Sequence, residues 1–428
     1  MALALLIGVS VLTVLVAVHW YLWRRLVKDV SRKGGPWRRT GTVLVWLLPA
    51  TTVATMIVGR SGAPFAVERV LAWPGYLWLA LLLYLTLALL LGELVRPLLL
   101  RTLPRRPAPS EAAPALQDAE RSPVRGPGGE ATDGAPEASG AAAPEAAETD
   151  RPQDASRRLF VARSVAIGAA TLAAGTVTAG TVGVLNGPTT KRVTVTLPKL
   201  PRRAHGYRVA VVSDVHLGPI LGRAHTRRIV EAINATQPDL VAIVGDLVDG
   251  TVADLGPAAE PLTQLRSRHG SFFVTGNHEY FGDARSWIDH LRDLGIHPLE
   301  NQRRELPGFD LAGVNDVEGE RVGEGPDFRA ALGDRDPARA SVLLAHQPVQ
   351  IHDAVEWDVG LQLSGHTHGG QLWPGPYLAE LANPTVAGLE RYGDTQLYVT
   401  RGAGTWGPPV RVGAESDITV VTLSSPDA

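Results

Sequence analysis

The sequence predicts an α/β domain of two packed mixed β-sheets flanked by helices, preceded by a multi-span α-helical membrane region. Three observations support this fold class. Long uninterrupted apolar runs occupy the N-terminal part of the 428-residue chain. From Val193 onward, short β-branched runs alternate with helical patterns, which implies parallel strands joined by crossover helices. The later strands lie closer together along the chain, which favours a second sheet packed on the first.

Residues 1–100 are predicted to form a membrane region with three transmembrane helices. Each of its apolar runs is long enough to cross a hydrocarbon layer of about 30 Å. The runs are Leu3–Trp23, Gly41–Gly59 and Val70–Leu91. The connection after the first run is strongly basic, with Arg24, Arg25, Lys28, Arg32, Lys33, Arg38 and Arg39, whereas the next connection holds only Arg60, Glu68 and Arg69. The positive-inside rule therefore places the N-terminus outside the cytoplasm.

Residues 101–158 are rich in Ala, Pro, Glu and Gly and almost lack large apolar side chains, which predicts a disordered linker. The small-residue apolar run at 159–186 is predicted to be a fourth transmembrane helix or signal-anchor. Arg157 and Arg158 precede it and fit either a twin-arginine export signal or a plain basic flank. Insertion of this helix would place the domain at 190–428 outside the cytoplasm, and without it the domain would lie inside.

Composition narrows the chemistry of that domain. The chain has no cysteine, so a metal site must use oxygen and imidazole ligands. The formal net charge is −2, which argues against nucleic acid as a partner because nucleic-acid-binding domains carry a basic surface. The candidate functional residues are therefore those with carboxylate, amide or imidazole side chains.

Five short polar blocks stand where predicted strands end. They read SDVH at 213–216, GDLVD at 245–249, GNHE at 276–279, AHQP at 345–348 and SGHTHGG at 364–370. Side chains at strand ends are held by a rigid sheet and can converge in space despite wide separation along the chain. Each block alone is a weak signal, but no structural need explains two imidazoles between glycines, and all five together predict a metal site.

The residue types in these blocks suit divalent cations. Asp214 and Asp246 each follow an uninterrupted apolar strand, where a carboxylate without a partner would be costly to bury. Asp246 is the natural candidate to bridge two cations with its two oxygens. The other candidate ligands are His216, Asn277, His346, His366 and His368. Ligation by oxygen and nitrogen without sulfur suits Mn, Fe or Zn.

The blocks resemble those of the calcineurin-like metallophosphoesterase superfamily, and in particular its bacterial membrane-anchored cell-envelope members, over roughly Tyr207 to Leu423. The resemblance implies an αββα sandwich that binds two divalent metal ions. It assigns Asp214, His216, His368 and the bridging Asp246 to one metal, and Asp246, Asn277, His346 and His366 to the other. It also places His278 by the leaving group, oriented by Asp249.

The predicted function is a membrane-anchored, metal-dependent phosphoric ester hydrolase. It would hydrolyse phosphomonoesters or phosphodiesters by a bimetal-bound hydroxide. The expected partners are membrane lipid and a phosphate ester, and the anchor suggests a lipid-linked or wall-linked ester. An alternative of another class is a non-catalytic sensor of a metal or ligand. His278 with Asp249 argues against the sensor, which has no use for a leaving-group acid.

Four residues near the blocks remain open at this stage. Glu279 is interpreted as an acid outside the ligand set, and His225 as a surface or hydrogen-bonded histidine. Trp373 and Trp406 lie in Gly/Pro-rich loops past the later blocks. They would rim the active-site mouth, face the membrane or pack in the interior, and the sequence does not separate these alternatives.

Overall fold

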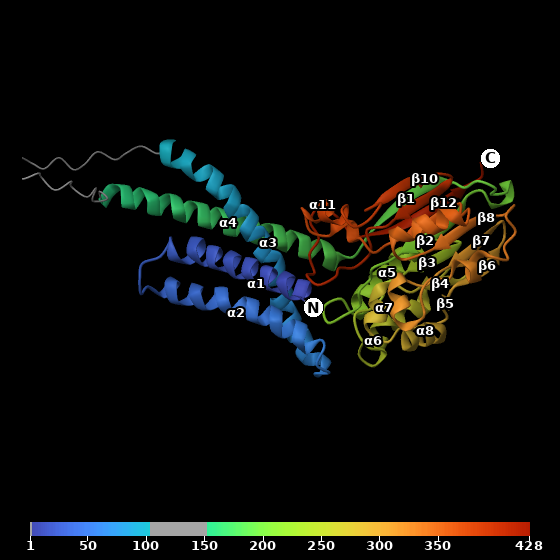
Figure 1. Ribbon diagram of the computed structural model, residues 1–428, viewed down its shortest axis with the longest axis horizontal. Helices are drawn as coiled ribbons and strands as arrows, with labels where there is room; N and C mark the ends of the chain where they lie inside the picture. Colours follow the sequence, from blue (N-terminus) through green and yellow to red (C-terminus); the bar gives the residue numbers. More distant parts are fainter. Residues whose placement is uncertain (1, 103–151) are drawn as a thin grey trace, which may run out of the picture.

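The computed structural model describes residues 2–102 and 152–428 (Figure 1). Most of the linker predicted at 101–158 lies outside the described residues. Figure 1 shows a group of long helices, formed by the N-terminal part of the chain, beside an α/β domain formed by the rest.

Four helices in the described part of the chain are long and apolar enough to cross a membrane. They are α1 (Ala2–Leu22), continued by the π-helical turn η1 (Trp23–Lys28), α2 (Pro36–Val58), α3 (Phe65–Thr102) and α4 (Pro152–Asn186). Helix α4 begins at Pro152, seven residues before the predicted start of the fourth span. The Ala, Ser and Arg residues there are compatible with a helix, and a helix can extend beyond the part that crosses a membrane.

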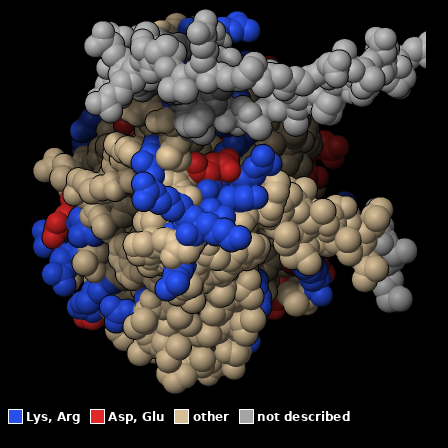
Figure 2. All heavy atoms as spheres, turned by 90° about the vertical axis from the view of Figure 1, so that its left-hand side faces the viewer, with Lys and Arg blue, Asp and Glu red and all other residues tan. Residues whose placement is uncertain are grey.

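A mostly basic group of charged residues of these helices lies at the end that points away from the α/β domain. Figure 2 looks onto that end and shows Lys and Arg side chains grouped together. Arg25 pairs there with Asp29 at 2.9 Å and with Glu93 at 2.8 Å, and Arg163 donates to the carbonyl oxygen of Val30 at 3.0 Å. These contacts join residues from η1, α3 and α4 with the first connection. The basic connection and the α/β domain therefore lie at opposite ends of the helices.

The α/β domain contains two six-stranded mixed sheets. In spatial order, the first sheet consists of β1 (Thr189–Thr196), β12 (Asp417–Ser424), β2 (Tyr207–Val212), β3 (Leu240–Val244), β4 (Ser271–Val274) and β5 (His297–Pro298). The second consists of β10 (Gly388–Tyr392), β11 (Thr395–Val399), β9 (Leu361–Ser364), β8 (Ala340–Leu344), β7 (Phe309–Gly313) and β6 (Gln302–Leu306). Strands β2, β3, β4 and β5 are parallel, as are β7, β8, β9 and β11.

The central strands are buried on both faces, which is why they read as continuous apolar runs. Val209 and Val211 of β2 point into the core between the two sheets, where they join Val342 and Leu344 of β8. Their neighbour Ala210 points outward and packs beneath helices. Helices α5 (Arg223–Ala235), α6 (Val252–Ala259) and α8 (Ala284–Asp293) cover the first sheet, and α9 (Phe328–Leu332) and α10 (Ile351–Glu356) cover the second. The predicted fold class is confirmed.

The remaining helical elements are short. They are η2 (Arg202–Ala204), η3 (Glu260–Gln264), α7 (Asn277–Phe281), η4 (Val317–Val322), η5 (Pro348–Gln350), η6 (His368–Gly370) and α11 (Gly375–Ala379). The sequence pattern of Pro257–Ser267 predicts one helix, whereas the structure has α6 followed by η3. The Thr251 side chain accepts a hydrogen bond from Asp254 N and starts the helix earlier, and η3 continues it as a tighter turn.

His225 on α5 departs from its sequence interpretation. The residue is buried, and neither ring nitrogen has a hydrogen-bond partner among the described residues. Burial, with the nearby charges of Arg228 and Arg411, lowers its pKa to about 4, so the imidazole is neutral near pH 7. The surface interpretation of this histidine is therefore wrong.

Candidate metal centre

The five polar blocks meet at one edge of the sandwich. Asp214, Asp246 and Asn277 follow the parallel strands β2, β3 and β4 of the first sheet, and His346 and His366 follow β8 and β9 of the second. The carboxyl ends of parallel neighbouring strands meet at the same edge of a sheet. The packing of the two sheets then brings both sets of strand ends together.

The backbone at this edge is held in a conformation that residues with side chains rarely adopt. Asp214, His216, Asp246, His366 and His368 have φ angles of 51°, 46°, 52°, 73° and 53°. Left-handed conformations of this kind cost non-glycine residues on the order of 1–3 kcal/mol each. Five of the seven predicted ligands carry this cost. Such strain concentrates at functional sites, where it aims particular side chains.

Two glycines of the blocks allow these loops to approach one another. A methyl group at Gly276 would collide with the backbone and carboxylate of Asp246, and one at Gly365 would collide with the side chains of Ser213 and Asp214. The glycines that precede Asn277 and His366 are therefore required by the close contact of neighbouring loops. They bring a ligand candidate from one block against a carboxylate from another.

The first ligand group predicted from the sequence is assembled in the structure. Nε2 of His216 and Nε2 of His368 lie 3.0 Å apart, and Nε2 of His368 lies 3.4 Å from Oδ1 of Asp214. Nε2 of His216 lies 3.7 Å from Oδ2 of Asp246. The ring nitrogens and the carboxylate oxygens therefore face a common point, as the ligands of one cation would.

The second predicted group shares Asp246 with the first. Nε2 of His346 lies 3.2 Å from Oδ2 of Asp246, and Nδ1 of His366 lies 3.0 Å from Oδ1 of Asn277. Nδ1 of His346 lies 2.8 Å from the carbonyl oxygen of Val244, which can only accept, so this nitrogen carries the proton. Nε2 of His346 is buried without a hydrogen bond. A cation beside it would give this orphaned nitrogen a partner, so the residues fit a metal site.

Burial and charge act strongly on these groups. Burial lowers the pKa of His366 to about 4, so that its imidazole is neutral near pH 7, as a metal ligand must be. Burial would also lower the pKa of His216, but the carboxylate of Asp249 outweighs it and raises that pKa to about 9. Metal binding at His216 would therefore release a proton.

Asp249 holds two imidazoles rather than the one that the sequence assigned to it. Its Oδ1 accepts from Nδ1 of His278 at 2.7 Å and from Nδ1 of His216 at 2.9 Å. Burial alone would raise the pKa of Asp249, but the two histidines lower it to about 2. The carboxylate is thus ionised near neutral pH, and it turns Nε2 of both rings toward the centre.

Glu279 is buried beside the ligand groups, so of the two positions that the sequence allows for it, at the surface or behind the ligands, the structure has the second. Its carboxylate accepts from the backbone nitrogens of Gly276 at 2.7 Å, Leu247 at 2.8 Å and Asp246 at 3.0 Å. The side chain therefore joins the loop after β3 to the loop after β4. The position of Glu279 directly after Asn277 and His278 is the only sequence signal for this role. The sequence does not indicate which backbone nitrogens its carboxylate binds.

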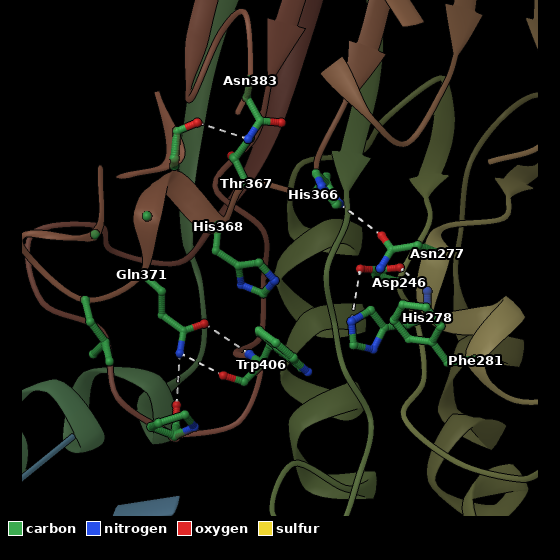
Figure 3. A pocket seen from close by; sticks show the side chains of 15 residues that line it. Asp246, Asn277, His278, Phe281, His366, Thr367, His368, Gln371, Asn383 and Trp406 are labelled. Carbon is green, nitrogen blue, oxygen red and sulfur yellow. Dashed lines mark hydrogen bonds and ion pairs between the residues drawn. The ribbon is translucent and has the colours of Figure 1, made fainter. Parts of the chain in front are cut away.

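A cavity of about 590 Å³ opens beside the centre. Its lining includes Asp246, Asn277, His278, His366 and His368, together with residues of the segment from Gly370 to Asn383 and of the loop that contains Trp406 and Pro408. Figure 3 shows His368, Gln371 and Trp406 on one side of the cavity and Asn277, His278 and Phe281 on the other. The candidate ligands are therefore accessible to a substrate of moderate size.

Comparison with known proteins agrees with this geometry. The family model described as calcineurin-like phosphoesterase matches residues 207–370. A transmembrane protein with metallophosphoesterase domain from Danio rerio is 40% identical over 258 residues, which cover 57% of this chain and 59% of that protein. An uncharacterized metallophosphoesterase from Helicobacter pylori is 38% identical over 239 residues, covering 55% of this chain and 64% of the relative.

A third relative is matched over most of its length. This uncharacterized metallophosphoesterase from Aquifex aeolicus is 32% identical over 238 residues, which cover 54% of this chain and 90% of the relative. The chain spans less than two thirds of the Danio rerio and Helicobacter pylori proteins. The family model covers all five blocks, and this chain belongs to the calcineurin-like metallophosphoesterase family.

Proposed function

We propose that this protein is a membrane-anchored hydrolase of phosphomonoesters or phosphodiesters that works with two divalent metal ions. The observation that carries the proposal is the convergence of six further ligand candidates around Asp246, beside an imidazole fixed by Asp249. Family membership supports a phosphate ester as the substrate. The four apolar helices and the relatives named as transmembrane proteins support membrane association.

Each residue of the centre has a distinct task in this proposal. One metal would be held by Asp214, His216, His368 and Asp246, and the other by Asp246, Asn277, His346 and His366. When bound, two divalent cations would supply positive charge that neutralises a phosphate ester and acidifies water. The nitrogen and oxygen donors suit Mn, Fe or Zn. Asp246 fixes the spacing of the two groups because it belongs to both.

The first test is metal-dependent turnover by the full chain in detergent. We expect the protein to hydrolyse bis-p-nitrophenyl phosphate when supplied with Mn²⁺, to lose this activity in chelator and to regain it when Mn²⁺ is restored. Turnover is followed by absorbance and bound metal by elemental analysis. Protein that carries its full metal complement but shows no turnover would favour the non-catalytic sensor instead.

His278 is proposed to serve the leaving group. Its backbone nitrogen donates to Oδ1 of Asp246 at 2.9 Å, and its ring is held through Nδ1 by Asp249, so Nε2 is free to face the departing oxygen. A proton or a strong hydrogen bond from Nε2 would stabilise that oxygen as its bond to phosphorus breaks.

His278→Gln tests this role through the leaving group. We expect kcat for an alkyl phosphate ester to fall by about 100-fold or more, and kcat for a p-nitrophenyl ester by less than about tenfold. The reason is that p-nitrophenolate is weakly basic and departs without a proton. Equal losses on both esters would contradict the assignment and indicate a role in binding or folding.

The catalytic domain is proposed to lie outside the cytoplasm. The basic connection at 24–39 is at the end of the helices away from the domain (Figures 1 and 2), and basic connections favour the cytoplasmic side. With the N-terminus outside, four spans bring residues after Gly187 to the outside again.

A reporter fused after Ala428 tests this orientation in a bacterial host. We expect a fused alkaline phosphatase to be active, because it matures only outside the cytoplasm, and a fused green fluorescent protein exported by the general secretory route to be dark. A fusion truncated after Lys33, in the basic connection, is the matched control and should give the reverse pattern. An inactive phosphatase after Ala428 would place the domain in the cytoplasm.

A further inference from the structure

Exposed apolar side chains lie on the segments that line the cavity. This apolar collar consists of Phe281 and Trp406, which line the cavity themselves, and of Trp373, Tyr377, Leu378 and Leu381, which belong to the segment from Gly370 to Asn383. Their exposed fractions range from 49% for Trp373 to 83% for Leu381. Soluble monomers rarely expose large apolar side chains grouped in this way, and such groups mark contact with a protein, a ligand or a membrane.

The segments that carry the collar contact the apolar helices α3 and α4. The Tyr84 hydroxyl of α3 donates to the carbonyl oxygen of Trp373 at 3.1 Å, and the backbone nitrogen of Arg411 donates to the carbonyl oxygen of Gly180 in α4 at 3.4 Å. Leu372 and Val410 pack into the apolar cluster formed by α1, α3 and α4. Figure 1 shows α11 beside the domain-facing parts of α3 and α4.

The positions of these contacts along the helices indicate how deep in the bilayer the collar lies. Gly180 lies 17 residues from Arg163 of the basic end, or about 25 Å at the usual helical rise. Tyr84 lies nine residues from Glu93 of the same end, or about 14 Å by the same measure. Both distances are shorter than a hydrocarbon layer of about 30 Å. The segment that carries the collar therefore meets the helices within their apolar stretch, at a level between the middle of a bilayer and its outer boundary.

Side chains of α11 face in two directions at this level. Gly375 and Ala379 line the cavity, whereas Tyr377 and Leu378 of the same helix are exposed. Leu381 follows the helix and is the most exposed member of the collar. Apolar and aromatic side chains at this depth are stabilised by acyl chains and the headgroup region. One thin wall thus separates the cavity from the bilayer.

The collar also reaches the group that is proposed to serve the leaving oxygen. The ring of His278 lies 5.0 Å from that of Phe281 and 5.7 Å from that of Trp406, measured between centroids. Trp406 is held in place by Gln371, whose Oε1 accepts from Trp406 N at 3.1 Å and whose Nε2 donates to Trp406 O at 3.0 Å. The space next to the leaving oxygen is therefore bounded by aromatic, apolar surfaces.

We propose that the ester hydrolysed at this centre belongs to a membrane lipid, whose hydrocarbon chain lies along the apolar collar while its phosphate reaches the metal centre. This inference rests on the proposed function. In the reaction, water adds to phosphorus and the bond from phosphorus to the lipid oxygen breaks. That oxygen takes up a proton, so the products are a lipid alcohol and a water-soluble phosphate. The apolar collar holds the lipid side of the bond, which is the side that leaves.

The activity test compares esters that differ only in their chains. The full chain with Mn²⁺ is assayed in nanodiscs on phosphatidic acid against glycerol 3-phosphate, and on phosphatidylglycerol against glycerophosphoglycerol. We expect kcat/KM for one lipid to exceed that of its water-soluble counterpart by at least about tenfold, the effect of burying a modest apolar area. Bis-p-nitrophenyl phosphate is measured in parallel to report on the metal centre itself.

Variants of the collar connect this preference to its residues. The combined Leu378→Asp and Leu381→Asp variant is expected to lower the ratio of the lipid rate to the p-nitrophenyl rate by at least about tenfold. Val355→Asp is the matched control, since Val355 is 40% exposed on α10, an element with no residue in the cavity lining. It should leave that ratio unchanged.

A second measurement reads the depth of the collar without using activity. Because the chain has no cysteine, a single spin label can be attached at Leu381→Cys or at Val355→Cys. In nanodiscs, the label at 381 is expected to relax faster with oxygen, which concentrates in lipid, and the label at 355 with a water-soluble nickel complex. Equal accessibility to the nickel complex at both positions would overturn the placement of the collar in the bilayer.

The outcomes separate the inference from the function on which it rests. Turnover of p-nitrophenyl esters without any preference for the lipid members of the pairs would overturn the lipid inference and leave the phosphoesterase intact. A preference that the double variant does not alter would remove the collar from the proposal. Absence of turnover on every ester by fully metallated protein would overturn the proposed function, and the lipid substrate with it.

Discussion

Replacing Asp246 by Asn is expected to lower kcat/KM for phosphate esters by at least about a thousandfold. Oδ2 of Asp246 lies 3.2 Å from Nε2 of His346 and 3.7 Å from Nε2 of His216, while Oδ1 accepts from the backbone nitrogen of His278. An amide has one oxygen and one NH₂ group, so it loses the charge and turns a donor toward one ligand group or toward a backbone N–H. Either orientation separates the two groups that Asp246 joins.

Metal content gives a readout of the same variant that does not depend on turnover. Elemental analysis after dialysis is expected to show that Asp246→Asn retains about half of the wild-type metal or less, because each cation loses a charged ligand. Asp289→Asn is the matched control, since Asp289 is exposed on α8 and makes only a surface ion pair with Arg292. Wild-type rates and metal content in Asp246→Asn would end the assignment of a shared carboxylate.

Asp246 can be recognised in the sequence as a candidate ligand for a physical reason. Strands β2, β3, β8 and β9 are buried on both faces, so each appears as an apolar run that ends sharply at a polar block. A carboxylate or an imidazole at such a strand end needs a partner. The combination of these residue types indicates that the partner is a divalent cation. The strand ends of the two sheets meet when the sheets pack against each other. The order of strands and helices along the chain predicts such a pair of packed sheets.

Strands β5, β6 and β10, which lie at sheet edges, were not predicted, whereas the edge strand β1 was predicted as Val193–Leu197. Strand β6 reads QRREL and strand β10 reads GLERY, with mostly polar or exposed side chains, and β5 has only two residues. An edge strand is defined by pairing with a single neighbour that is already formed, as β10 pairs with β11. No periodic pattern of apolar residues within such a strand predicts that pairing.

The supports of the metal centre were also beyond the reach of the sequence. Glu279 binds two backbone nitrogens of the loop after β3, and Asp249 accepts from His216 as well as from His278. These contacts join segments about 30 residues apart and depend on how the loops fold back, which local spacing does not encode. Arg411 is the extreme case, because it belongs to none of the five blocks.

Arg411 is a buried cation that ties the metal centre to the membrane helices. Its guanidinium donates to the carbonyl oxygens of Arg401 at 2.7 Å, Gly404 at 2.8 Å, Ala414 at 2.9 Å and His368 at 3.0 Å. Burial lowers its pKa to about 10, so it remains charged near pH 7. Four carbonyl groups solvate this charge, and the backbone nitrogen of the same residue contacts α4.

Replacing Arg411 by Met is therefore expected to destabilise the domain by about 3–5 kcal/mol, because buried carbonyl groups lose their donors and the loop that carries His368 loses its support. The thermal unfolding midpoint of the full chain in detergent should fall. The chelator concentration that removes half of the bound metal should fall with it. Arg411→Lys keeps the charge but offers a single ammonium in place of a planar fork, so it should give an intermediate loss.

The matched control for these variants is Arg391→Met, which removes an exposed arginine from the edge strand β10 and should change neither quantity. A lower unfolding midpoint with unchanged metal retention would make Arg411 a stabilising residue without influence on the centre. Unchanged values for both quantities in Arg411→Met would contradict its role altogether. If both fall together, the path from α4 through Arg411 to His368 contributes to metal binding, and the membrane helices act as part of the catalytic scaffold in addition to anchoring it.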